Sequence, residues 1–139
     1  MTWFAKPFFA LGFGAFFLCA ATCAHFDELA MPWSLVPDWA AGLVLIGGAV
    51  ISQREWVTGR QYQIAAWAFM VSLLFGSFVG NVEEWASPTT DAAATATDGL
   101  VSLSQGPYIV IIGLLLALAL AGLTTTLGTK TARPLQDAD

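Results

Sequence analysis

Charged side chains are scarce in this sequence of 139 residues. They make up 11% of the chain, whereas apolar residues make up 57%. An average soluble domain has about 25% charged residues. So few charges could not cover a surface that faces water, so the composition predicts an integral membrane protein.

The chain also lacks the residue sets on which most catalytic and nucleic-acid-binding proteins depend. It has one histidine, no glycine-rich phosphate loop and no recognisable spacing of nucleophile and base. A single histidine excludes haem ligation by two histidines. Five Lys and Arg against ten Asp and Glu leave no basic face for nucleic acid. We therefore expect no enzymatic activity, no cofactor and no nucleic-acid partner.

No ionisable side chain lies near the middle of any long apolar stretch. Coupled transporters keep such a buried charge within the membrane because it binds the coupling ion. Classical coupled transport by a single chain is therefore not the favoured function.

What the sequence does contain is four long apolar stretches. A helix that crosses the hydrocarbon core needs about 20 residues, and about 17 can suffice. Backbone groups in lipid must be bonded within the segment, so each stretch is predicted to be a helix. The prediction is an all-α integral membrane four-helix bundle that forms a single membrane domain over residues 1–139. The predicted spans are 7–24, 38–53, 62–82 and 107–127, followed by a polar tail over 128–139.

Basic residues are confined to one side of this arrangement. They precede the first span, lie between the second and third, and follow the fourth: Lys6, Arg54, Arg60, Lys130 and Arg133. The other two connections contain only acids: Asp27, Glu28, Asp38, Glu83, Glu84, Asp91 and Asp98. Because Lys and Arg mark the cytoplasmic side, both termini are predicted to be cytoplasmic, in an inner or plasma membrane. The first span also has features of a signal peptide, but its removal would disrupt this arrangement at Lys6, so we expect it to be retained.

Two features predict how the helices pack. The connection 54–60 is short, so the second and third spans should be antiparallel neighbours. Small residues recur at a spacing of four, which lets membrane helices approach closely. These stripes are predicted to face one another inside the bundle, and they are Ala15, Cys19 and Cys23; Ala40, Gly48 and Ser52; Ser72, Gly76 and Gly80; and Gly113, Ala117 and Ala121.

The stretch "CAATCAHFDE" (19–28) concentrates groups that could bind a metal ion. Thiolates and imidazole bind soft or borderline ions such as Cu(I) and Zn(II). The candidates are Cys19, Cys23, His25, Asp27 and Glu28, with Glu83 and Glu84 on the same side of the membrane. Their spacing matches no zinc signature. The favoured interpretation is that Cys19 is a buried packing residue, Cys23 lies near the outer interface and His25 lies just beyond it. No catalytic, cofactor-binding or metal-binding residue is therefore assigned.

Together these patterns predict a small multi-pass membrane protein without catalytic machinery. The leading hypothesis is an accessory or assembly subunit, or a self-associating helix bundle. Its partners would be membrane lipid and either another membrane protein or further copies of this chain. The alternative is a small transporter or a cation-binding carrier that uses the acidic residues of the outer side.

Overall fold

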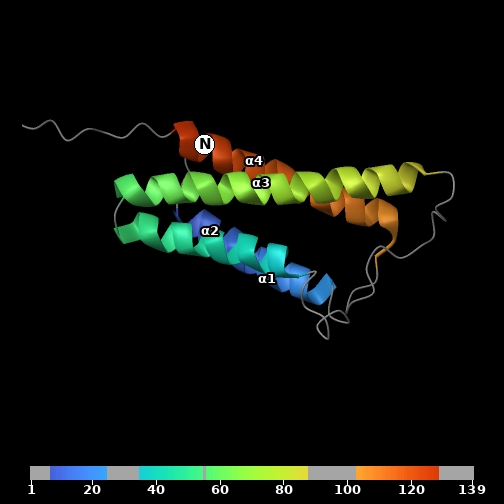
Figure 1. Ribbon diagram of the computed structural model, residues 1–139, viewed down its shortest axis with the longest axis horizontal. Helices are drawn as coiled ribbons and strands as arrows, with labels where there is room; N and C mark the ends of the chain where they lie inside the picture. The colour runs from blue at the N-terminus through green and yellow to red at the C-terminus, as the bar shows by residue number, and fades with distance from the viewer. Residues whose placement is uncertain (1–6, 25–34, 55, 88–102, 129–139) are drawn as a thin grey trace, which may run out of the picture.

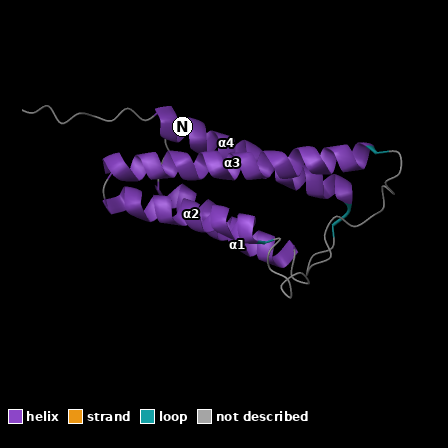
Figure 2. Ribbon diagram, viewed as in Figure 1, coloured by secondary structure: helices purple, strands orange, loops and turns teal. Residues whose placement is uncertain are grey.

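The computed structural model describes residues 7–24, 35–54, 56–87 and 103–128, and these residues are almost entirely helical (Figures 1 and 2). The helices are α1 (Pro7–Ala24), α2 (Val36–Arg54), α3 (Trp56–Ala86) and α4 (Gln105–Gly128). The predicted all-helical chain with four helices is confirmed over these ranges. All four are long and apolar enough to cross a membrane.

Three of the helices coincide with the predicted spans to within two residues at either end, whereas α3 is much longer. It has 31 residues, so it is about 46 Å long at 1.5 Å per residue. That exceeds the hydrocarbon core, which is about 30 Å thick. Most of the predicted connection 54–60 is therefore the first turn of α3, because a helix does not have to end where its apolar stretch ends. Glu83 and Glu84 are likewise part of its last turns.

The helices pack in chain order, α1 on α2, α2 on α3 and α3 on α4. Figure 1 shows α3 between α4 and α2, and it shows α2 running antiparallel to α3 as predicted. One end of the bundle holds the last residues of α1 and α3 and the first residues of α2 and α4. We call this the Glu83 end, and the opposite end the Arg60 end. Toward the Glu83 end, α1 and α2 diverge from α3 (Figure 1).

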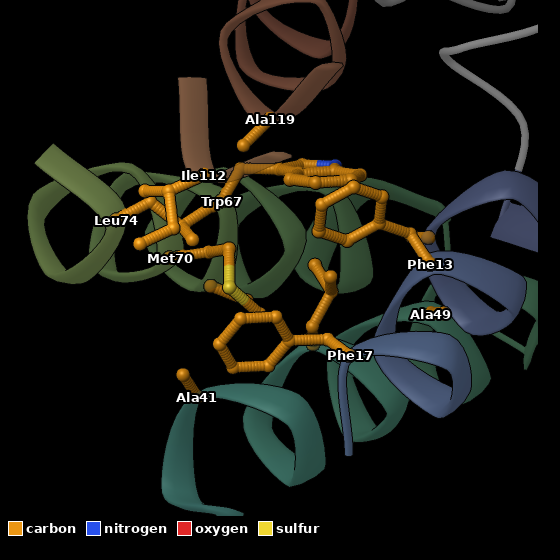
Figure 3. Packing of buried hydrophobic residues seen from close by; sticks show 12 residues of the cluster. Phe13, Phe17, Ala41, Ala49, Trp67, Met70, Leu74, Ile112 and Ala119 are labelled. Atoms are coloured by element: carbon orange, nitrogen blue, oxygen red, sulfur yellow. The ribbon is translucent and has the colours of Figure 1, made fainter. Parts of the chain in front are cut away.

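Trp67 is the centre of the core. Its side chain is fully buried, and its ring lies 5.3 Å from the ring of Phe13 on α1 (Figure 3). The ring of Phe9, also on α1, lies 5.8 Å from it. Gly122 of α4 also lies against the indole, and an added methyl group there would come within 2.6 Å of two ring atoms. A single side chain of α3 thus holds α1 and α4 in the same layer of the core.

Glycines mark the other close approaches between helices. On α1 and α2, an added methyl group at Gly14 would lie 3.0 Å from the carbonyl oxygen of Gly42. Between α2 and α3, a methyl group at Gly48 would lie 3.3 Å from the backbone of Gln63, and one at Gly59 would overlap the backbone of Ser52. These approaches of α2 to α3 all lie in the half of the bundle nearer Arg60, which agrees with the divergence at the other end.

The predicted small-residue stripes are mostly not these contact faces. All three stripe residues of α1 are exposed, and so is Ala117 on α4. An added methyl group at Gly76 or Gly80 would meet nothing within 4 Å in the structure as described. The α2 stripe is largely right, since Gly48 and Ser52 are buried, and on α4 the stripe residue Gly113 packs against Phe78. The reason is that these helices are apolar on every side, so a spacing of four cannot indicate which side faces the bundle.

Candidate functional site

The two cysteines do not pack inside the bundle. Both are free thiols with exposed side chains on α1. The inward face of α1 instead consists of Ala10, Phe13, Gly14, Phe17 and Ala21. The prediction that Cys19 is a buried packing residue is therefore wrong, because Cys19 lies on the opposite side of the helix from Phe17 and Ala21.

The other candidate metal ligands are not brought together in the part of the chain that the structure describes. Glu83 and Glu84 are exposed on the last turns of α3. His25, Asp27 and Glu28 lie outside the described residues. Among the described residues, no three His, Cys, Asp or Glu side chains converge as metal ligands would.

The charged side chains of the described ranges separate cleanly by sign. Asp38, Glu83 and Glu84 lie at the Glu83 end, and Arg54 and Arg60 lie at the Arg60 end. No charged side chain lies between them in 7–24, 35–54, 56–87 or 103–128. The middle of the bundle is therefore apolar over a length suited to lipid.

Arg60 joins α3 to the end of α4. Its guanidinium donates hydrogen bonds from Nε to the carbonyl oxygen of Thr126 at 3.1 Å and from Nη2 to that of Leu127 at 2.9 Å. The last carbonyls of a helix have no partner within it, and they carry partial negative charge. A cation at this position therefore satisfies two of them and stabilises the α3–α4 pair.

At the Glu83 end, side-chain hydrogen bonds connect α3 to α4 and α1 to α2. Gln105 of α4 donates to the Oδ1 atom of Asn81 on α3 at 3.1 Å. Trp39 of α2 donates from Nε1 to the hydroxyl of Thr22 on α1 at 3.2 Å. Each bond joins two helices of a pair, α3 to α4 or α1 to α2, and neither crosses the region where the two pairs diverge.

A cavity of about 270 Å³ lies in that region of divergence. Its floor is formed by the buried side chains of Phe17, Ala21, Leu74 and Ile112. Its rim includes exposed residues of α1 and α4, among them Phe16, Cys23 and Ile111. The few polar residues that line it are Cys23, Asp38, Ser77 and Tyr108.

Asp38 is the one acidic residue that lines this cavity. It lies in the first turn of α2 and is half-buried. The arrangement is a hydrocarbon-like chamber with a carboxylate at one end. Such a cavity can accept an apolar ligand that carries a positively charged group. It offers too few oxygen atoms to hold a metal ion.

Sequence reasoning did not identify this site. Asp38 was interpreted only as part of the acidic outer connection, and Tyr108 and Phe17 only as parts of apolar spans. One signal was available, since an acid in the first turn of an apolar helix lies beside the hydrocarbon layer. The divergence of the helices, which creates the cavity, left no sign in the sequence.

Comparison of the chain with protein-family models, curated proteins and solved structures finds no match in any of the three.

Proposed function

We propose that the four helices span an inner or plasma membrane with both termini in the cytoplasm, and that the protein acts without catalysis as an accessory or assembly subunit. The Arg60 end would then face the cytoplasm. The separation of acids from bases supports this orientation, because Lys and Arg accumulate on the cytoplasmic side of membrane proteins.

Large apolar side chains on the outside of the bundle support the membrane location. Phe8, Leu43, Phe75 and Leu114 are each more than half exposed, and they come from four different helices. A soluble monomer rarely leaves so much apolar surface in water. In a bilayer the same surface would contact lipid chains.

The observation that carries the subunit role is an exposed row of small residues on α3. Ala68, Ser72, Gly76 and Gly80 repeat at a spacing of four, and all are exposed. Nothing within 4 Å occupies the side of Gly76 or Gly80 in the described structure. We call this row the α3 small face. In lipid, such rows let another helix approach to backbone distance, where packing drives association. The partner would be another membrane protein or a second copy of this chain.

Leucine substitutions on the α3 small face test this role. Gly76→Leu and Gly80→Leu should weaken association by roughly five- to a hundredfold, since overpacking costs about 1–3 kcal/mol. The measurement is pull-down from native membranes in mild detergent, with a second tagged copy to detect self-association. Ala117→Leu, on an exposed position of α4, is the matched control.

None of the three substitutions should lower the thermal stability of the isolated protein, because none of these positions is buried inside the bundle. A partner recovered equally with Gly76→Leu, Gly80→Leu and Ala117→Leu would contradict the proposed role of this face.

A second candidate function is a small carrier that binds cations at the Glu83 end. It is favoured by Asp38, whose half-buried carboxylate lines the cavity beside α1 and α4.

A further inference from the structure

The cavity between α1, α3 and α4 has the dimensions of a binding site for a small molecule. Its volume of about 270 Å³ is nearly twice that of a cavity of about 150 Å³ that admits benzene. Four elements contribute to its wall, and its floor is made of side chains that are at most 8% exposed. It is therefore part of the fold, deeper than the ordinary roughness of a helix surface.

The walls select an apolar body. Most of the lining residues are Phe, Leu, Ile or Ala, including Phe17, Leu74 and Ile112. Apolar walls of this kind gain van der Waals contacts when a hydrocarbon group packs against them. In the described structure α1 and α4 are not one of the packed helix pairs. The hydrocarbon chain of a ligand can thus enter from the side, between α1 and α4, past the exposed rim residues Phe16 and Ile111.

The charge at the site determines which head group the ligand can carry. Asp38 is half-buried at the cavity, and Glu83 and Glu84 lie at the same end of the bundle. The described basic residues, Arg54 and Arg60, lie at the opposite end. An anionic head group would be repelled here, and a positive one would be attracted.

An inorganic cation does not fit these walls. Calcium takes 6–8 oxygen ligands, and magnesium needs a full octahedron. One carboxylate and the hydroxyls of Ser77 and Tyr108 supply too few oxygen atoms to replace the lost hydration shell. An alkylammonium group differs from an inorganic cation because its carbon substituents can pack against the apolar walls. Only one side of the ammonium group then needs to contact the carboxylate.

We propose that this cavity binds an amphiphilic organic cation, with its hydrocarbon body against α1, α3 and α4 and its ammonium group beside the carboxylate of Asp38. The site does not depend on the α3 small face, so either proposal can fail without the other.

The two exposed cysteines provide the test. Cys23 lines the cavity, whereas Cys19 lies one turn earlier on α1 and does not. Cys19→Ser leaves Cys23 as the only thiol, and Cys23→Ser leaves Cys19. In nanodiscs of the uncharged lipid digalactosyldiacylglycerol, which has no ammonium group, decyltrimethylammonium should slow the alkylation of Cys23 by a maleimide and leave the rate at Cys19 unchanged. Equal slowing at both thiols would reflect a general effect of the membrane and would overturn the proposal.

A head-group series with the same chain separates the two parts of the site. Decanol should protect Cys23 more weakly than decyltrimethylammonium, and decyl sulfate least of all. Equal protection by the three probes would mean that the cavity takes hydrocarbon alone, which would overturn the assignment to cations.

Asp38→Asn should weaken protection by decyltrimethylammonium about fivefold, as expected for one partly exposed ion pair, and leave protection by decanol unchanged. Undiminished protection in Asp38→Asn would refute the role of the carboxylate. Ala21→Phe fills the floor of the cavity and should abolish protection by every probe. If that variant does not fold, the isosteric Asp38→Asn still decides the outcome.

Discussion

Gln63 is a fully buried polar residue whose side chain has no hydrogen-bond partner among the described residues. The same holds for Nε1 of Trp67, one turn later on α3. A buried polar group without a partner costs about 1–3 kcal/mol. The backbone of Gln63 forms the α2–α3 contact at Gly48. The side-chain carbonyl and amide groups of Gln63, which have no partner among the described residues, thus weaken that contact.

Replacing Gln63 by methionine should therefore stabilise the protein. Methionine has nearly the same length and flexibility, and it removes both polar atoms. We expect Gln63→Met to raise the free energy of unfolding by about 1–3 kcal/mol. The measurement is thermal unfolding in detergent.

Gln61→Met is a suitable control, since Gln61 is exposed on the same helix and its replacement should have little effect. Loss of stability in Gln63→Met would show that the buried amide is hydrogen-bonded in the native bundle.

At the scale of helices, the two helices of each packed pair come closest at a glycine, which has no side chain. Gly122 of α4 accommodates the ring of Trp67, and Gly113 lies against Phe78. In lipid the hydrophobic effect adds little between helices, so close packing of this kind supplies most of the attraction. The contacts are consequently sensitive to a single methyl group.

The same substitution on two helices tests this account. Gly122→Ala would place its methyl group 2.6 Å from Trp67, so it should destabilise the bundle by about 1–3 kcal/mol. Gly76→Ala meets nothing within 4 Å and should be neutral, or stabilising by up to about 1 kcal/mol, because alanine is the better helix former.

Thermal unfolding of the two variants beside the parent protein decides between these outcomes. A Gly122→Ala variant as stable as Gly76→Ala would mean that Trp67 can move away at no cost.

At the scale of the whole molecule, charge and shape both distinguish the two ends. The Arg60 end is closed by α2–α3 contacts at Gly59 and by the bonds of Arg60 to α4. The Glu83 end is acidic and splayed, and it contains the cavity. In the proposed topology all four helices span the membrane, which would place both termini on the same side.

Thiol labelling can establish this topology. In a background without Cys19 and Cys23, cysteines at Thr2 and Ala138 should react only from the cytoplasmic side, and one at Thr95 only from outside. The three positions lie outside the described residues, and the expectation rests on the distribution of Lys and Arg. Labelling of Thr2 and Thr95 from the same side would contradict the four-span topology.

The sequence by itself determined the number of helices and most of their positions. Runs of about 20 apolar residues can satisfy their backbone in only a few ways, so the four helices followed from length and composition. The arrangement of charge was equally readable, because Arg54, Arg60, Glu83 and Glu84 mark the limits of the apolar runs. The short connection after Arg54 also determined that α2 and α3 pack together.

Only the tertiary structure decided which side of each helix faces the bundle. A soluble helix shows its buried side by its apolar residues, but here Cys19 and Phe17 are both compatible with lipid and with the core. The contact faces depend on how Trp67, Gly122 and their neighbours fit together in three dimensions. The cavity beside Asp38 depends on the angle between the helix pairs, which is set by those same contacts and has no counterpart in the local sequence.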